Sequence, residues 1–338
     1  MNTALRTDIG SFNGAPGFGA ALLRCGGSVP DAVQLMRTAA PLPLNAQLLI
    51  DKAVVDVGLE RLIVAGELQA RGLVYPLTNA LGVLDLYSEN ESKAGFAQRS
   101  MEPRSRGEAQ LLDRAGVHLP IYCTWDDFNF GIRVLLAAER SGAPLDVSMT
   151  KQAVRRVNES IEDAVINGSG VVSGGNQAYG LLNEPNVNRT IYGSNLAWDN
   201  ASKTGDEILT DILAMITKLQ AAHKYGPYTL ILPTAYGLTV TKDFKTYSTT
   251  TILQRIKEID TGSGPITVIT ADRMPTDRTV LMQMTSDVAE LVVGQVPTVI
   301  NWGTPDGMSQ NFLVLAIVVP RIRSDYDKNS GICVGFTS

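Results

Sequence analysis

The fold is set by residues 125–168, WDDFNFGIRVLLAAERSGAPLDVSMTKQAVRRVNESIEDAVING, which are predicted to form two helices joined by a short polar connection. In the second half, apolar residues recur at steps of three and four. Asp146 is the expected N-cap, and Asn167-Gly168 is the expected stop, because glycine tolerates the left-handed conformation that ends helices. About 20 residues at 1.5 Å each give a rod roughly 30 Å long, on which the flanking segments can pack. Its apolar stripe consists of Met149, Ala153, Val154, Val157, Ile161, Ala164 and Val165.

The composition is that of a folded globular protein. Of the 338 residues, 44% are hydrophobic and 19% are charged, which is enough to bury a sizeable core. The net charge is −5 and Lys/Arg tracts are missing, which argues against tight binding to nucleic acid. Cys25, Cys123 and Cys333 are odd in number and far apart, so we expect a reducing cytoplasm and no disulfide framework. Neither a signal peptide nor a run of about 18 apolar residues occurs, so no membrane span is expected.

The N-terminal third changes character along its length. Residues 1–43 are rich in Gly, Pro, Ala and Asn and are expected to form an arm with one short helix, Pro30–Arg37. A second helix is predicted over Asn45–Arg71. Gly82–Tyr87 and Leu119–Trp125 have strand character, and a long charged stretch separates them. Because a structureless loop of that length is unusual in a compact subunit, we expect a hairpin that reaches onto a neighbouring copy.

From Thr204 onward the pattern becomes α+β, with short helices and strands separated by Asp, Pro, Gly and Thr turns. The expected elements are helices Gly205–Tyr225, Ala235–Val240 and Thr250–Ile259, and strands Tyr228–Leu232, Ile266–Thr270, Thr279–Gln283, Leu291–Val293, Thr298–Trp302 and Phe312–Val319.

Motifs for catalysis, cofactors and metals are incomplete. His118 and His223 lack partners at metal-ligand spacing, so structural roles are expected. The glycine-rich run 168–174 follows a helix, whereas a dinucleotide fingerprint follows a strand. A calcium-loop pattern begins at Asp325, but Ser330 stands where glycine is needed and Phe336 where a bidentate glutamate is needed. Phosphate-binding loop and nucleophile-elbow motifs are missing. We therefore predict no catalytic, cofactor-binding or metal-binding residues.

The charged stretch between the two predicted strands holds the candidate functional residues. Its mixed signs suit pairing with another copy of the chain, while a merely solvated excursion is the alternative. The candidate assembly contacts are Lys93, Arg99, Glu102, Arg104, Arg106 and Glu108.

The order of these elements resembles the Hong Kong 97 fold of tailed-bacteriophage major capsid proteins and of the related encapsulins. The segments that carry the resemblance are Pro120–Phe128 leading into the helix pair, the helix end Ile166–Gly168, and the linker Gly180–Asn183. Ala271–Pro275 and Val318–Ile322 add to it near the end of the chain. The resemblance covers nearly the whole chain and lies in the order of the segments more than in any one motif.

The resemblance implies an α+β capsid fold with defined parts. These are an N-terminal arm (1–43), a helix leading into the loop (44–81), an extended loop (82–122), the spine helix and peripheral domain (123–203), an axial domain (204–301), and a return strand of the peripheral domain with the C-terminus (302–338).

The resemblance also implies a function. The chain would be a structural, non-enzymatic protein without cofactors that self-assembles as hexamers and pentamers into the icosahedral shell of a tailed phage. That shell would enclose double-stranded DNA, touched weakly and non-specifically. Neighbouring subunits would be the main partners, with portal, scaffold or decoration proteins as further ones and no membrane. The protein would be located in the virion capsid, which would be assembled in the cytoplasm of the bacterial host.

Two alternatives stay open. The first is an encapsulin shell enclosing a cargo enzyme, and the second is a soluble α/β enzyme with its site between the two halves. Two family features have no counterpart in the sequence. The charged scaffolding region carried by many members is missing, so scaffolding is expected from elsewhere. Lys93 lies in the loop that some members cross-link, but no matching asparagine or glutamate is found, so cross-linking is not expected.

Overall fold

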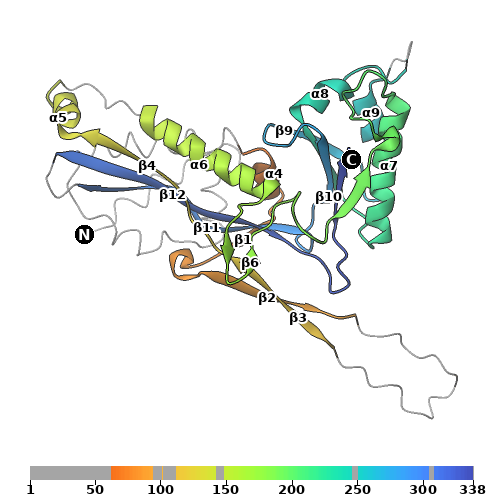
Figure 1. Ribbon diagram of the computed structural model, residues 1–338, viewed down its shortest axis with the longest axis horizontal. Coiled ribbons are helices and arrows are strands. Elements are labelled where there is room, and N and C mark those ends of the chain that lie inside the picture. The colour runs from red at the N-terminus through yellow and green to blue at the C-terminus, as the bar shows by residue number, and fades with distance from the viewer. Residues whose placement is uncertain are drawn as a thin grey trace.

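The computed structural model of the chain describes residues 62–93, 101, 112–141, 148–245, 250–303 and 308–337. Its elements form two sheets, each covered by a long helix, and a hairpin that projects from the body (Figure 1). The predicted arm, the predicted helix Pro30–Arg37 and the predicted cap Asp146 lie outside the described residues. Among the helices of the described residues, none has the length and apolar character needed to cross a membrane.

The first sheet carries the long helix that the sequence predicted. In the described residues its strand order is β1 (Val74–Pro76), β11 (Ala289–Gly303), β12 (Ser309–Ile322) and β4 (Thr124–Gly131). β1 runs parallel to β11, and the other pairs are antiparallel. Helix α6 (Ser148–Asn167) lies along one face of this sheet (Figure 1), which confirms the predicted rod.

The packing under α6 explains why β4 is a strand. Residues 125–131 were predicted to be helical, and this prediction was wrong. The stretch alternates, so that Phe128 and Phe130 turn toward the core while the residues between them stay exposed. Phe128 stacks on its cross-strand partner Phe312 with ring centroids 5.2 Å apart. Such aromatic cross-strand pairs stabilise a sheet. Helix α5 (Ile132–Ser141) follows directly.

The second sheet forms the other half of the body. Its strand order in the described residues is β7 (Asn188–Ile191), β13 (Ile332–Phe336), β10 (Arg278–Gln283), β8 (Tyr228–Pro233) and β9 (Thr267–Ala271). Helix α7 (Gly205–Ala221) packs against β7 and β13 and begins with a capping box between Thr204 and Glu207. Further elements of the described chain are α8 (Thr234–Val240), α9 (Ile252–Lys257), β5 (Val172–Ser173), β6 (Asn176–Gln177) and short 3₁₀ turns at Ala80–Gly82 and Gly193–Asn195.

The predicted strands Leu291–Val293 and Thr298–Trp302 are parts of one strand, β11. The pairing of β11 with β12 shifts register on both sides of Gln295, so an irregular stretch interrupts the alternation that sequence patterns detect. β1, β7 and β13 were not predicted. β1 and β7 span only three and four residues, which is too short for a pattern to show.

Helix α4 (Val64–Ala70) is joined to α6 by a buried carboxylate. A helix continuous from Asn45 to Arg71 is ruled out, because Leu62 lies outside the helix and α4 starts at Val64. The first N–H groups of α4 have no partner within the helix. The backbone N–H groups of Val64 and Ala65 donate to the Glu162 carboxylate at 2.6 and 3.1 Å. Glu162 is 2% exposed, so this contact fixes α4 on the spine.

Candidate assembly site

The projecting hairpin consists of β2 (Asp85–Glu91) and β3 (Arg114–Pro120), which pair antiparallel from Asp85↔Pro120 to Glu91↔Arg114. A strand begins in the first predicted segment and pairs antiparallel as expected, but the second prediction, Leu119–Trp125, was largely wrong: only Leu119 and Pro120 belong to β3. Trp125, which was assigned to the second strand, belongs to β4 instead. Figure 1 shows the hairpin leaving the body on the side opposite α6.

One face of the hairpin carries a ladder of polar cross-strand contacts. His118 contacts Asp85. The ring of Tyr87 lies over Gly116, where a Cβ atom would come within 2.8 Å of it. Arg114 pairs with Glu89 at 3.3 Å and with Glu91 at 3.2 Å. An isolated two-stranded ribbon is marginally stable, so these pairs help to hold the strands together.

The two histidines lie in different parts of the fold. His118 is part of the hairpin ladder. His223 follows α7 with a positive φ of 60° and therefore turns the chain toward β8.

Of the predicted assembly contacts, Lys93 lies in the described residues, and Arg99, Glu102, Arg104, Arg106 and Glu108 lie outside them. Lys93 follows β2 and its ammonium group lies 3.0 Å from the Asp327 carboxylate. The hydrogen bond to Asp327 raises the pKa of Lys93. Sequence reasoning missed Asp327, because it lies near the other end of the chain. Its calcium-like setting, Asp325-Tyr-Asp327, was the available signal.

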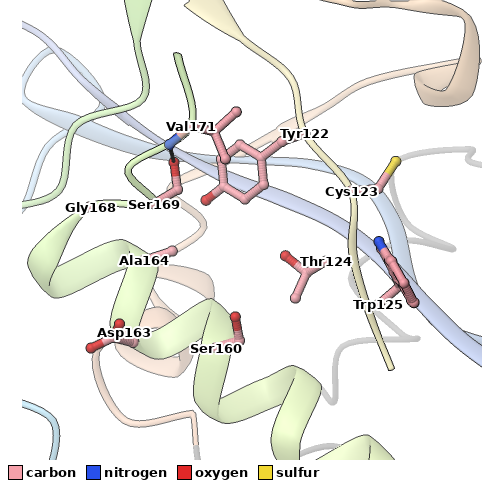
Figure 2. Close-up of a pocket in the computed structure, with 10 residues that line it drawn as sticks. All are labelled: Tyr122, Cys123, Thr124, Trp125, Ser160, Asp163, Ala164, Gly168, Ser169 and Val171. Carbon is pink, nitrogen blue, oxygen red and sulfur yellow. Dashed lines mark hydrogen bonds between the residues drawn. The ribbon is translucent and has the colours of Figure 1, made fainter. Parts of the chain in front are cut away.

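A pocket of about 270 Å³ lies between α6 and the chain that leads into β4 (Figure 2). The side chains of Tyr122 and Thr124 point toward α6, whereas Cys123 and Trp125 point to the other side of the strand. Burial raises the pKa of Tyr122 to about 12, so its hydroxyl stays protonated. The residues lining the pocket are Tyr122, Cys123, Thr124, Trp125, Ser160, Asp163, Ala164, Gly168, Ser169 and Val171.

This pocket is suited to binding water or one polar group. Hydroxyl groups and the Asp163 carboxylate supply hydrogen-bond partners. Burial raises the pKa of the Cys123 thiol, which disfavours the nucleophilic thiolate. Within the described parts of the chain, no cluster of three or more His, Cys, Asp or Glu side chains is arranged to hold a metal ion.

Comparison with known proteins identifies the family to which the chain belongs. A family described as "Family of unknown function (DUF6260)" matches residues 80–335. The chain belongs to this family. For the DUF6260 protein, the matching region starts just before β2 and ends within β13, so it includes the hairpin and the long strands β11 and β12, while β1 lies before it. No curated protein matches.

Solved structures show which fold the DUF6260 protein has. A virus-like particle from Pyrococcus furiosus is 19% identical, with 84% of this chain and 97% of that chain covered and a TM-score of 0.58. The capsid of Myoviridae Phage XM1 is 13% identical over 79% of this chain and 90% of that chain, with a TM-score of 0.60. The capsid of a native GTA particle is 11% identical over 80% and 90%, with a TM-score of 0.57. The chain therefore has the predicted Hong Kong 97 fold.

Proposed function

We propose that this DUF6260 protein is a major capsid subunit that self-assembles into a closed icosahedral shell. The observation that carries the proposal is the exposed β2–β3 hairpin, which projects from a body with the Hong Kong 97 fold. A two-stranded projection buries little apolar surface on its own subunit. A neighbouring subunit would supply the missing surface, so the hairpin is suited to joining copies of the chain.

The body is a layered unit in which a long helix covers a sheet of long strands, and we expect it to behave as a stiff plate. β11 and β12 span 15 and 14 residues, and α6 packs on β12 and β4 with apolar side chains that are almost fully buried. Burial of apolar area stabilises such a layered unit by about 25 cal/mol per Å², and its close packing makes it stiff. Individual contacts between stiff plates can be weak, because a closed shell makes many of them at once.

The remaining parts of the proposal follow from the resemblance. The arm, the extended loop, the peripheral domain and the axial domain would take the residue ranges given above, with subunits arranged as hexamers and pentamers. The shell would belong to a tailed-phage virion, assemble in the host cytoplasm with portal, scaffold or decoration proteins, and enclose double-stranded DNA. The net charge of −5 favours weak, sliding contact with that DNA. We assign no enzymatic activity.

A second candidate is a nanocompartment shell that encloses a cargo enzyme. The observation that favours it is the likeness to the Pyrococcus furiosus virus-like particle, of whose subunit 97% is covered.

The test is to express the full chain and to measure particle mass by light scattering, with absorbance at 260 and 280 nm across the same peak. Closed particles in the megadalton range support the proposal. High absorbance at 260 nm would favour the DNA-filled capsid, and a protein-only spectrum with co-purified enzyme would favour the nanocompartment. A species that stays near 36.3 kDa at every concentration and with a crowding agent contradicts both.

A further inference from the structure

The chain between β12 and β13 forms a closed turn at residues 324–330. Ser324 and Ser330 form a backbone bridge across its base. Inside it, the Asp325 N–H donates to the Asn329 carbonyl at 3.0 Å, and the Lys328 N–H donates to the Asp325 carbonyl at 2.8 Å. The turn is therefore a compact unit with its own hydrogen bonds. Because it connects a strand of one sheet to a strand of the other, it lies at the junction of the two sheets.

The body holds this turn in place. The side-chain amides of Asn186 and Asn188 donate to the Ser324 hydroxyl and to the Ser330 carbonyl, each at 3.0 Å. Ser330 is fully buried. Lys224, at the end of the α7 segment, lies 3.9 Å from Asp325 and pairs with Asp287. The turn thus has fixed support from the half of the body that contains β7 and α7.

Both strands of the hairpin contact the same turn. From the β2 side, the Asn90 amide donates to the Ser324 carbonyl at 2.9 Å, and Lys93 pairs with Asp327. From the β3 side, Asp113 accepts a hydrogen bond from the Tyr326 hydroxyl. The Ser92 N–H donates to the Asp113 carbonyl at 2.8 Å, so the two strands are tied together where they meet the turn.

We propose that the turn of residues 324–330 is a latch that fixes the direction of the β2–β3 hairpin relative to both sheets. At its root the hairpin is held on the body by the apolar cluster that contains Ile121 together with Val292 and Ile317 of the first sheet. The hairpin also contacts β6 through β3. Without contacts further along its strands, it could change its direction relative to the body. The second support, at Asn90, lies about 20 Å further along the strand, and two separated supports define a direction.

The latch acts as a set of weak contacts. The side chains of Lys93 and Asp327 are 57% and 51% exposed, so their pair is screened by salt. The bond from Asn90 to Ser324 is partly buried and does not depend on charge. A hairpin held in one direction loses less conformational freedom when it docks on another copy, so the latch lowers the entropic cost of docking.

The test measures hairpin direction within one subunit. Spin labels are placed at Val117→Cys on the hairpin and Leu213→Cys on α7, in a Cys25→Ser/Cys123→Ser background. Labelled chains are kept dilute, or mixed with excess unlabelled chains if shells form, so that each distance is intramolecular. The readout holds whether or not the chain assembles, which separates it from the test of the proposed function.

The decisive variant removes the three hairpin contacts through Asn90→Ala, Tyr326→Phe and Asp327→Lys. We expect the narrow label-to-label distance distribution to be lost. Adding Lys93→Asp restores the ion pair with its charges exchanged and should narrow the distribution again, which also shows that the variant is folded. The matched control is Lys245→Asp, which breaks an equally exposed pair with Asp206 on the far side of the body. An unchanged distribution in the triple variant would overturn the latch.

Discussion

Glu162 shows how a single buried charge can join two elements. Its carboxylate accepts hydrogen bonds from the start of α4, and it is nearly inaccessible to water. Burial raises its pKa, which outweighs the opposite effect of the backbone donors. The folded protein therefore binds the proton of Glu162 more readily than the unfolded chain does, and this has a consequence for the pH dependence of stability.

We expect two substitutions at Glu162 to behave differently. Glu162→Gln resembles the protonated acid, so it should match the wild type below the unfolded pKa of 4.5. As pH rises through the raised folded pKa, the wild type should lose stability relative to this variant. Glu162→Ala leaves two buried N–H groups without an acceptor and should cost about 1–3 kcal/mol. Urea unfolding of subunits from pH 4 to 8 measures both effects.

The control for these measurements is Glu159→Gln on the same helix, which removes a partly exposed contact with Arg273. Because exposed ion pairs contribute little, this variant should follow the wild type at each pH. A Glu162→Gln variant whose stability runs parallel to the wild type at all pH values would show that Glu162 does not titrate in this way.

At the C-terminal end of α6, the linker that follows provides hydrogen-bond donors to the last carbonyl groups of the helix. The N–H groups of Leu181 and Leu182 donate to the carbonyls of Val165 and Ile166 at 2.9 and 3.0 Å. The linker thus supplies partners for carbonyl groups at the end of the helix. This requires close backbone contact, because a Cβ atom at Gly180 would lie 2.2 Å from the backbone nitrogen of Gly168.

We therefore expect Gly180→Ala to push the linker off the helix and to lower the free energy of unfolding by about 1–3 kcal/mol. Gly66→Ala is the matched control. Its Cβ would meet only Leu62, at 3.9 Å, and alanine favours the helix in which it lies. Thermal unfolding of both variants should show a lower midpoint for Gly180→Ala alone. Equal midpoints would mean that the linker can move away from the helix without lowering the stability of the fold.

The helices and strands that could be predicted are those in which the spacing of apolar residues within the element is regular over its whole length. Helix α6 has a regular apolar stripe, and its observed end at Asn167 agrees with the predicted stop. β4 was mistaken for helix, since Phe128 and Phe130 alternate for only a few residues before a helical pattern begins. Lys93 was chosen for its charge, but its contact with Asp327 depends on the tertiary fold and could not be inferred from spacing.

At the scale of the whole molecule, the junction between the two sheets is where the fold and the hairpin meet. β12 leaves one sheet, the 324–330 turn follows, and β13 enters the other. The same turn contacts Asn90 in β2 and Asp113 directly before β3. A change in the relative position of the sheets would therefore be passed to the hairpin, and the reverse also holds.

Three arginines in the charged stretch between β2 and β3 are expected to join copies of the molecule. Reversing Arg99, Arg104 and Arg106 to Glu should leave the subunit folded, because these residues lie in a sequence stretch with almost no large apolar side chains. Assembly should be impaired, since mixed charges that match a neighbour become like charges that repel it. Replacing the same three residues with Lys keeps the charge and is the control. Circular dichroism measures whether the subunit is folded, and light scattering measures how much of the protein has assembled into shells. Normal shells from the Glu variant would show that these arginines do not join neighbouring subunits.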